Sequence, residues 1–414
     1  MSKYSKNLNK NEINIEVKYG LPSNVEFCKS CVISNQRPSS TVEFYNVIEE
    51  KKKTINFNDD GICDACKWAD YKDNNVDWIE REEELKTLLD KFRSRNSSYD
   101  ILVPGSGGKD SIYASHILKY KYNMHPLTVT WSPHLYTDVG FKNFQNWMHV
   151  GGFDNFLFTP NGRIHRKLTK LAYTNLLHPF QPFILGQKYF APKLADKFNL
   201  PLVFYGENEA EYGNPIDENL TSKRKIEYFV QNFKDSKDFF ISGLSSSQLE
   251  EEGIHKNDLA PYLPVTDPNF LKKNIEIHYL GYYKKWTPQE CYYYSVENAD
   301  FQANPERTEG TYSKYNSIDD KTDGYHYWTT FIKFGIGRAT YDAAQEIRNG
   351  HINREEGVAL VRKYDGEFPK KYFKEFLRYL DLSEDKFFEI ADTFRSPHLW
   401  EKINGNWQLK NKVK

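Results

Sequence analysis

The sequence has few cysteines, almost no net charge and no long apolar run. Its 56 Lys and Arg against 57 Asp and Glu give a formal net charge of -1, which provides no overall attraction to nucleic acid or to an anionic membrane. No window approaches the roughly 18 apolar residues that a membrane-spanning helix needs. The first residues, MSKYSKNLNKNEINIEV, lack the apolar region of a secretory signal. We therefore expect a cytoplasmic protein with no membrane partner, and the charge balance does not favour a nucleic-acid partner.

Only five cysteines occur in the 414 residues, and four of them form two CxxC pairs near the N-terminus. This usage favours a reducing compartment and a metal over a disulfide framework. Two CxxC turns can close a tetrahedral site that has no open position. A redox function is less favoured, because neither pair opens a helix after a strand. We predict a structural zinc site, and an iron–sulfur cluster stays open as an alternative; the predicted ligands are Cys28, Cys31, Cys63 and Cys66.

Strands and helices are expected to alternate through the middle of the chain. The buried-strand pattern SYDILVP precedes the helical pattern KDSIYASHILKYKY, and the strands PLTVTW, NFLFT and PLVFYG follow with helices between them. Such alternation is typical of βαβ units and a mostly parallel sheet. The predicted fold class is therefore α/β, a Rossmann-like parallel sheet with an N-terminal four-cysteine module and a helical C-terminal region.

A glycine-rich loop, SGGKDS, lies between the first predicted strand and its helix. A Walker A motif is excluded because Gly108 and Lys109 are followed by Asp110, and the residue five before Gly108 is Val103. A dinucleotide-binding GxGxxG motif also fails, since Asp110 stands where the third glycine belongs. The two glycines permit close approach of backbone to phosphate, and the serines and the lysine add donors and charge.

The residues SGGKDS resemble the PP-loop of the ATP pyrophosphatases, a group that includes GMP synthetase, asparagine synthetase and tRNA thiolases. The resemblance implies that the loop grips the β,γ-pyrophosphate of ATP, and that cleavage between the α- and β-phosphates places AMP on a substrate oxygen. Asp110 would also bind Mg²⁺, and both Lys109 and Asp110 would act in catalysis. The ATP-binding residues implied by the loop are Ser106, Gly107, Gly108, Lys109, Asp110 and Ser111.

Other stretches resemble a narrower family, the N-acetyl sugar amidotransferases of bacterial surface-glycan and nonulosonic acid pathways. The ordered series runs from about residue 27 to about residue 368 and comprises NDDGICDAC, VPGSGGKDS, VTWSPHLYTD, FTPNGRIHRKL, FQPFILGQKYFAPKLA, YGENEAEYG, RTEGTYSKYNSIDDK and IKFGIGRATYDAAQEIRNGHINREEGVALVRKYDGEFP. The resemblance implies that an acetamido group of a sugar or nonulosonic acid becomes an acetamidino group. The amide oxygen would be adenylated, pyrophosphate would leave, ammonia would attack, and AMP would depart.

This resemblance also implies cofactors and partners. ATP, Mg²⁺ and a structural Zn²⁺ are expected. The chain has no recognisable glutaminase cysteine motif, so we expect a separate glutaminase subunit similar to that of imidazole glycerol phosphate synthase, with a barrel-type subunit as a further candidate to bridge the two. The oligomeric state stays open, a homo-oligomer included.

A PP-loop tRNA thiolase, or another RNA-modifying adenylating enzyme, is the alternative function. Several such thiolases also carry zinc, so the loop and the paired cysteines do not decide between the two. Sulfur transfer generally needs further cysteines or an iron–sulfur site near the loop. The only cysteine after the pairs is Cys291, which we interpret as a buried small apolar residue.

Further site residues follow from strand ends, because ligands of parallel α/β sheets bind beyond the carboxyl ends of the strands. Thr130 and Trp131 are expected near the adenosine, and Gly206 near the reacting centre. Glu207 or Glu209 is the candidate to position Mg²⁺ or to accept a proton from ammonia, with a surface loop as the alternative interpretation. The remaining candidates, proposed for substrate binding, are Asn208, Tyr212, Gln187, Lys188, Arg307, Lys314, Tyr315, Asp319, Asp320, Lys333 and Arg338.

These expectations divide the chain into five regions, given in order. They are a flexible N-terminus (1–24), a four-cysteine zinc-binding module (25–77), the PP-loop ATP-binding domain (78–212), an insertion or lid (213–270) and a C-terminal, mostly helical region for substrate or partner binding (271–414).

Overall fold

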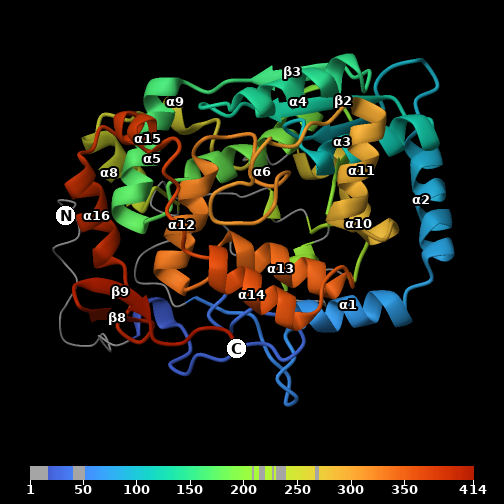
Figure 1. The fold of residues 1–414 in the computed structure, drawn as a ribbon. Helices are drawn as coiled ribbons and strands as arrows, with labels where there is room; N and C mark the ends of the chain where they lie inside the picture. The colour runs from blue at the N-terminus through green and yellow to red at the C-terminus, as the bar shows by residue number, and fades with distance from the viewer. Residues whose placement is uncertain are drawn as a thin grey trace.

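The central element of the fold is a five-stranded parallel sheet with the strand order β3–β2–β1–β4–β7 (Figure 1). The computed structural model describes residues 17–40, 52–207, 209–213, 220–225, 228–229, 239–265 and 270–414. The sheet confirms the predicted α/β class. Its strands are β1 (Ile101–Pro104), β2 (Pro126–Trp131), β3 (Asn155–Phe158), β4 (Leu202–Tyr205) and β7 (Glu276–Tyr279).

Helices cover both faces of the sheet, because alternate strand residues point to opposite sides. Leu102 faces α5 (Gly162–Leu176) and α6 (Gln181–Lys197), and its neighbours Ile101 and Val103 face α2 (Trp78–Phe92) and α3 (Lys109–His116). Helix α2 is formed by the stretch DWIEREEELKTLLDKF, with Asp77 as its N-cap. Strands β1, β2 and β4 are thus buried on both sides, whereas the edge strand β3 exposes Phe156 and Leu157.

The strand order changes direction between β1 and β4. From β1 the chain crosses to β2 on one side, whereas β4 pairs with the other side of β1 through Leu102 and Val203. The loops that follow these two strands therefore open side by side at the carboxyl edge of the sheet. This edge is the position at which open α/β sheets bind their ligands.

The C-terminal region is mostly helical, as predicted. Two of its helices have side-chain caps, since Asn353 caps α14 with a capping box and Ser383 caps α16. Trp328, Phe376 and Phe387 from these helices pack against Tyr173 of α5. The elements are α12 (Asp323–Phe334), α13 (Arg338–Arg348), α14 (Arg354–Tyr364), α15 (Phe373–Leu380), α16 (Glu384–Thr393) and the hairpin β8 (Trp400–Ile403) and β9 (Asn406–Leu409).

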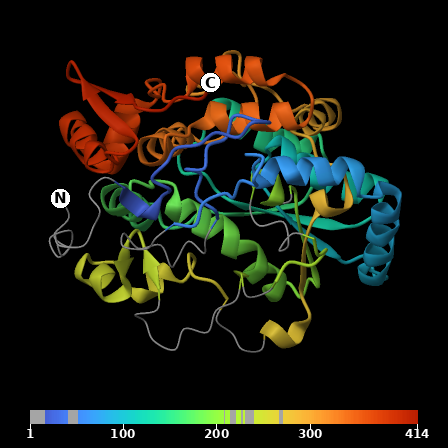
Figure 2. The ribbon, with the colours of Figure 1, turned by 90° about the horizontal axis from the view of Figure 1, so that it is seen from below.

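The four-cysteine module packs on these C-terminal helices. Its core includes Ala343 and Ala344 of α13 and Val361 of α14, and Arg354 Nε donates to the carbonyl oxygen of Cys31 at 3.1 Å. In Figures 1 and 2 the blue N-terminal segments and α1 (Asp64–Asn74) lie against the orange helices α13 and α14. The four-cysteine module and the helices α13 and α14 therefore share one packed core.

The region 213–270, for which an insertion or lid is predicted, is described in part. Residues 239–265 pack into the same core as α5 and α6 through Phe239, Leu249 and Tyr262. The lid role and the region boundaries stay predictions.

Among the described residues, no helix combines the length and the apolar character that crossing a membrane requires. Further elements are α4 (Asp138–His149), β5 (Phe240–Ile241), β6 (Leu244–Ser245), α8 (Ser246–Glu251), α9 (Lys256–Leu259), α10 (Leu280–Tyr283), α11 (Pro288–Ala299) and short helical turns at η2 (Lys18–Gly20), η4 (Ile117–Lys121), η5 (Glu209–Tyr212) and η7 (Phe270–Lys273).

Candidate functional site

The glycine-rich loop joins β1 to α3 at the edge where the sheet reverses. Gly107 has a φ of +83°, and a Cβ atom there would lie 2.6 Å from the Cα of Phe144, so only glycine fits. The hydroxyl of Ser295, on α11, donates to the carbonyl oxygen of Lys109 at 2.9 Å. The loop is thus fixed by α4 on one side and α11 on the other.

A cavity of about 610 Å³ opens beside this loop. Its size is typical of sites that hold small molecules. Residues from the N-terminal module, the sheet edge and the C-terminal helices all line it. The sequence-predicted site residues found in its wall are Ser106, Gly107, Gly108, Lys109, Asp110, Glu207, Tyr212, Tyr315, Asp319, Lys333 and Arg338.

Lys109 forms a close ion pair with the next residue, since its Nζ lies 2.5 Å from Oδ2 of Asp110. Burial lowers the pKa of Lys109, but the carboxyl groups of Asp110 and Glu207 outweigh that effect and the net pKa is raised. The lysine is therefore a buried ammonium ion at the start of α3. A charge of this kind at the loop suits phosphate oxygens.

Glu207 follows β4 and lies in the cavity wall close to Lys109 and Asp110 of the loop. Burial, together with the negative charge of Asp110, raises the pKa of Glu207 to about 7. The hydroxyl of Tyr212 donates to Oε1 of Glu207 at 2.6 Å, and burial raises the pKa of Tyr212. A carboxyl group with this pKa can exchange a proton near neutral pH, which is the property of a general acid or base.

Asp319 brings the C-terminal IDDK stretch to the loop. Ser106 Oγ donates to Oδ2 of Asp319 at 2.8 Å. On the other side, a Cβ atom on Gly140 would lie only 2.4 Å from the Cα of Asp319, so the absence of a side chain permits this close approach. The neighbouring Asp320 is buried and braces the start of α12, because its Oδ1 accepts from the backbone N–H and the hydroxyl of Thr322, both at 2.8 Å. It does not line the cavity.

Two of the predicted basic residues reach the cavity from the C-terminal helices. Arg338 Nε lies 3.0 Å from Oδ1 of Asp342, and the guanidinium group also contacts the ring and hydroxyl of Tyr327. Lys333 Nζ donates to the carbonyl oxygen of Leu176 at 3.0 Å. Both basic side chains are therefore held by other groups of the protein at the cavity.

The structure places four residues predicted for the ATP site or the reacting centre outside the cavity wall. Trp131 is a core residue, packed on Phe158 and Phe190, and Thr130 is completely buried. The reason is that helices cover both faces of β2, so neither side of its last two residues is open. Ser111 closes the first turn of α3, since its Oγ donates to the carbonyl oxygen of Gly108 at 2.9 Å. Gly206 lies under the ring of Trp286, next to the cavity.

Four residues predicted to bind substrate also lie elsewhere. Arg307 forms a paired contact with Glu367, with nitrogen–oxygen distances of 2.6 and 2.7 Å, and Lys314 Nζ donates to the carbonyl oxygen of Pro305. Gln187 is exposed on α6 and the neighbouring Lys188 lies near aromatic rings. Asn208 and the side chain of Glu209 lie outside the described residues.

Several cavity residues were not found by sequence reasoning. They have no common spacing and come from parts of the chain that are far apart, so no local pattern could have identified them. His326 is one example, and burial lowers its pKa well below its ordinary value, which makes it a neutral imidazole. The others that the cavity brings together include Arg37, Asn143, Asn175, His178, Trp286, Tyr327 and Gln345.

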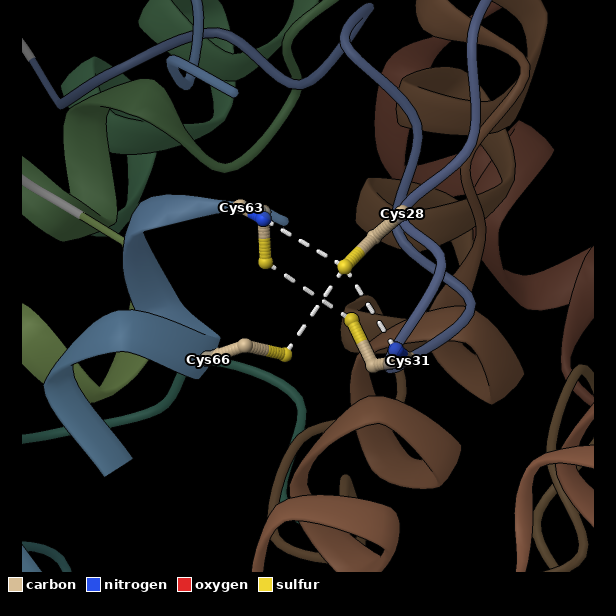
Figure 3. Close-up of side chains that lie close together, drawn as sticks. All are labelled: Cys28, Cys31, Cys63 and Cys66. Carbon is tan, nitrogen blue, oxygen red and sulfur yellow. Dashed lines mark hydrogen bonds between the residues drawn. The ribbon is translucent and has the colours of Figure 1, made fainter. Parts of the chain in front are cut away.

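The four paired cysteines meet in one cluster, with all four sulfurs within 4.8 Å of one another (Figure 3). The Cys28 and Cys66 sulfurs lie 3.8 Å apart and those of Cys31 and Cys63 lie 3.7 Å apart. Zn–S bonds of about 2.3 Å in a tetrahedron place the sulfurs roughly 3.8 Å apart. The spacing therefore fits one tetrahedral ion better than a multi-iron cluster, whose ligands are divided among different iron atoms.

A buried ion pair connects the four-cysteine module to the sheet edge. Lys72 of α1 lies 2.6 Å from Oε1 of Glu211, and the indole nitrogen of Trp68 donates to the same oxygen at 2.9 Å. Glu211 belongs to the short turn that follows Glu207. The module is thus joined directly to the segment that carries the candidate general base.

The strand order, the loop at the point of reversal and the SGGKDS sequence together define an α/β fold of the PP-loop type. Residues 309–414 match the model of the family described as "LPS biosynthesis protein WbpG-like, C-terminal domain". The C-terminal quarter of the chain is thus similar to this family of LPS biosynthesis proteins. This match supports the resemblance to enzymes of bacterial surface-glycan synthesis.

Other similarities are weaker. An uncharacterized protein of Methanocaldococcus jannaschii, MJ1599, is 32% identical over 79 residues, or 19% of this chain, and the chain spans about a quarter (27%) of that relative's length. Among solved structures, an NMN synthetase from Francisella tularensis is similar over 32% of this chain and 56% of its own, with 14% identity and a TM-score of 0.25. An NH3-dependent NAD synthetase from Campylobacter jejuni is similar over 48% of this chain and 91% of its own, with 14% identity and a TM-score of 0.28.

Proposed function

We propose that this protein is an ATP-dependent amidotransferase that converts the acetamido group of a sugar or nonulosonic acid into an acetamidino group. The observation that carries the proposal is that one cavity joins the SGGKDS loop, Glu207 and Asp319 in a chain with a WbpG-like C-terminal domain. The loop supplies the grip for phosphates, and Glu207, after the neighbouring strand β4, supplies the proton-transfer group.

In the first step, the amide oxygen of the acceptor attacks the α-phosphate of ATP and pyrophosphate leaves. The backbone around Gly107 and the ammonium group of Lys109 hold the departing phosphates, whose negative charge they offset. Asp110, beside Lys109, is the residue that would hold Mg²⁺, which offsets phosphate charge when bound. Adenylation turns a poor electrophile with a poor leaving group into a reactive imidate.

In the second step, ammonia attacks the activated carbon. A C–N bond forms, the nitrogen loses a proton, and AMP leaves with the oxygen that belonged to the amide. Glu207 is the group placed to accept that proton, because its pKa of about 7 lets it be ionised at neutral pH and still bind a proton. The hydrogen bond from Tyr212 fixes the carboxyl group in the cavity wall.

The proposal includes two protein partners, a glutaminase subunit and a barrel-type subunit. Ammonia at neutral pH is mostly ammonium, so a separate glutaminase subunit is the proposed source, with a barrel-type subunit as a candidate bridge. The four-cysteine cluster holds a structural Zn²⁺ in this proposal, since its four thiols leave no position for a substrate.

The experiment is a pyrophosphate-release assay with ATP, Mg²⁺, ammonium and a panel of N-acetylated sugars and nonulosonic acids. We expect release that depends on one class of acceptor and that disappears in Lys109→Ala, whereas Lys86→Ala, which changes an exposed lysine of α2, retains it. Release only in the presence of tRNA and a sulfur donor would replace the proposal with the thiolase function.

A further inference from the structure

Arg37 is a cavity residue that the proposed mechanism does not use. It lies six positions after Cys31 in the four-cysteine module and lines the same cavity as the glycine-rich loop. Only 5% of its surface is exposed. Its Nε and Nη1 atoms are buried and have no hydrogen-bond partner among the described residues.

The surroundings of Arg37 contain no compensating carboxylate among the described residues. Burial lowers the pKa of Arg37, while its hydrogen-bonding neighbour Tyr341 favours the charged form and the positive charge of Arg348 opposes it. Leaving a guanidinium group buried with unused donors is costly. The cost is removed if an anion enters the cavity and accepts from those donors.

Other cations of this cavity differ from Arg37 in this respect. Lys109 is paired with Asp110 at 2.5 Å, and Arg338 lies 3.0 Å from Asp342. A ligand that approached either of these residues would have to compete with a carboxylate that is already present. Arg37 offers donors that no described protein group occupies, and a guanidinium group matches the oxygens of a carboxylate or a phosphate.

The backbone of Arg37 is held by the module itself. Its N–H donates to the carbonyl oxygen of Ser34 at 3.2 Å, and its own carbonyl oxygen accepts from the N–H of Ile55 at 2.9 Å. Ser34 follows the first cysteine pair, and Ile55 precedes the second and belongs to the core of the module. The fold around the four cysteines thus fixes where the arginine enters the cavity.

We propose that Arg37 binds the anionic group of the acceptor, a carboxylate or a phosphate carried by the N-acylated sugar. The inference rests on the proposed function and deepens it, because it makes the four-cysteine module part of the acceptor site. It also assigns to Arg37 a part in substrate binding, which the sequence had suggested for Arg307 and Lys314, both of which lie outside the cavity wall.

The test is direct binding to the full-length, metal-containing protein, measured by calorimetry with three probes. N-acetylneuraminic acid carries a carboxylate, UDP-N-acetylglucosamine carries phosphates, and N-acetylglucosamine is neutral. We expect the wild type to prefer one anionic probe over the neutral sugar, and which probe it prefers identifies the anion. Arg37→Gln should weaken binding of that probe by about tenfold or more, as expected when hydrogen bonds to a charged group are lost, and leave the affinities for the neutral sugar and for ATP within about twofold.

Two further variants keep the test decisive. Arg37→Lys retains the charge and should restore part of the preference for the anion, even if Arg37→Gln folds poorly. Arg362→Gln is the matched control, because Arg362 donates to the carbonyl oxygen of Val413 outside the cavity, and it should bind all probes as the wild type does. Equal binding of anionic and neutral probes by the wild type would overturn the inference, as would a loss in Arg37→Gln that falls on ATP. These binding measurements need no turnover. A failure of the pyrophosphate-release assay therefore does not contradict the anion site, and a failure of the anion-binding test does not contradict the proposed reaction.

Discussion

The hydroxyl of Ser106 donates a 2.8 Å hydrogen bond to Asp319, a residue 213 positions further along the chain. This contact joins the glycine-rich loop to the C-terminal segment that matches the WbpG-like family model. Both regions line the same cavity, and neither forms its wall alone.

Removal of this contact should weaken ATP binding with little effect on the fold. Ser106→Ala loses one hydrogen bond, which corresponds to about 1 kcal/mol of stability, and it frees the loop from Asp319. We expect the KM for ATP to rise several-fold in the pyrophosphate-release assay. Ser247→Ala, at an exposed position of α8, is the control. An unchanged KM for ATP in Ser106→Ala would show that the contact does not position the loop.

Glu207→Gln should reduce turnover strongly while ATP binding persists. The amide cannot accept a proton, and general-base contributions are typically about 10²- to 10⁴-fold. In the wild type, turnover plotted against the concentration of free ammonia should rise with pH through about 7, the pKa of Glu207, because the ionised form is the base. The glutamine variant should lack that rise. Normal turnover in Glu207→Gln would show that another group accepts the proton.

Glu207 should also make the free energy of unfolding fall as pH rises, over the range in which it makes turnover rise. Because the folded pKa of Glu207 is raised from 4.5 to about 7, the folded protein holds a proton that the unfolded chain has already lost between these values. The contribution of this group is therefore fully present below pH 4.5 and is lost as pH rises to about 7. Chemical denaturation across this window should show a smaller loss of stability in Glu207→Gln than in the wild type. Parallel curves would contradict the raised pKa.

Cys63→Ser should remove the metal and destabilise the N-terminal module. The structure predicts one metal ion per chain, and loss of a ligand from a structural zinc site typically costs several kcal/mol of folding free energy. Native mass spectrometry and thermal unfolding give the measurement. Cys291→Ala is the control, since Cys291 is buried on α11 away from the cluster. A stable wild-type protein that contains no metal would contradict the prediction. Visible absorption from iron would show that the site holds an iron–sulfur cluster and not zinc.

Glu211→Ala should destabilise the protein more than any exposed ion-pair substitution. The change leaves the ammonium of Lys72 buried and unpaired, and breaking a buried pair in this way typically costs about 3–5 kcal/mol. Glu83→Ala removes an exposed partner of Lys86 on α2 and should cost less than about 1 kcal/mol. Urea denaturation compares the two. Equal losses of stability would mean that the ion pair between Lys72 and Glu211 contributes little to the free energy of unfolding.

The sheet, the loop and the metal cluster could be predicted because their signals are local. The apolar strand before SGGKDS, the CxxC spacing and the caps at Asn353 and Ser383 each lie within a few residues. The position of Glu207 followed from a general rule about strand ends. These features depend on backbone geometry that nearby residues determine.

The rest of the site depends on contacts between distant segments, which spacing does not reveal. Trp131 ends a strand as expected, but its ring packs towards Gly186 of α6, so it fills the core. Arg307 is basic and near the right motif, yet Glu367 holds it elsewhere. Arg37 gives no sequence signal at all, because only the packing of the four-cysteine module on α13 and α14 brings it to the cavity.

The fate of the amide oxygen tests the central proposal most directly. The acceptor is prepared with a heavy-oxygen label in its acetamido group and incubated with ATP, Mg²⁺ and ammonium, and the products are examined by mass spectrometry. The proposal predicts that the label appears in AMP, and that the sugar product shows the small mass loss that accompanies replacement of oxygen by NH. AMP without the label, together with a sugar that keeps its oxygen, would contradict the proposal.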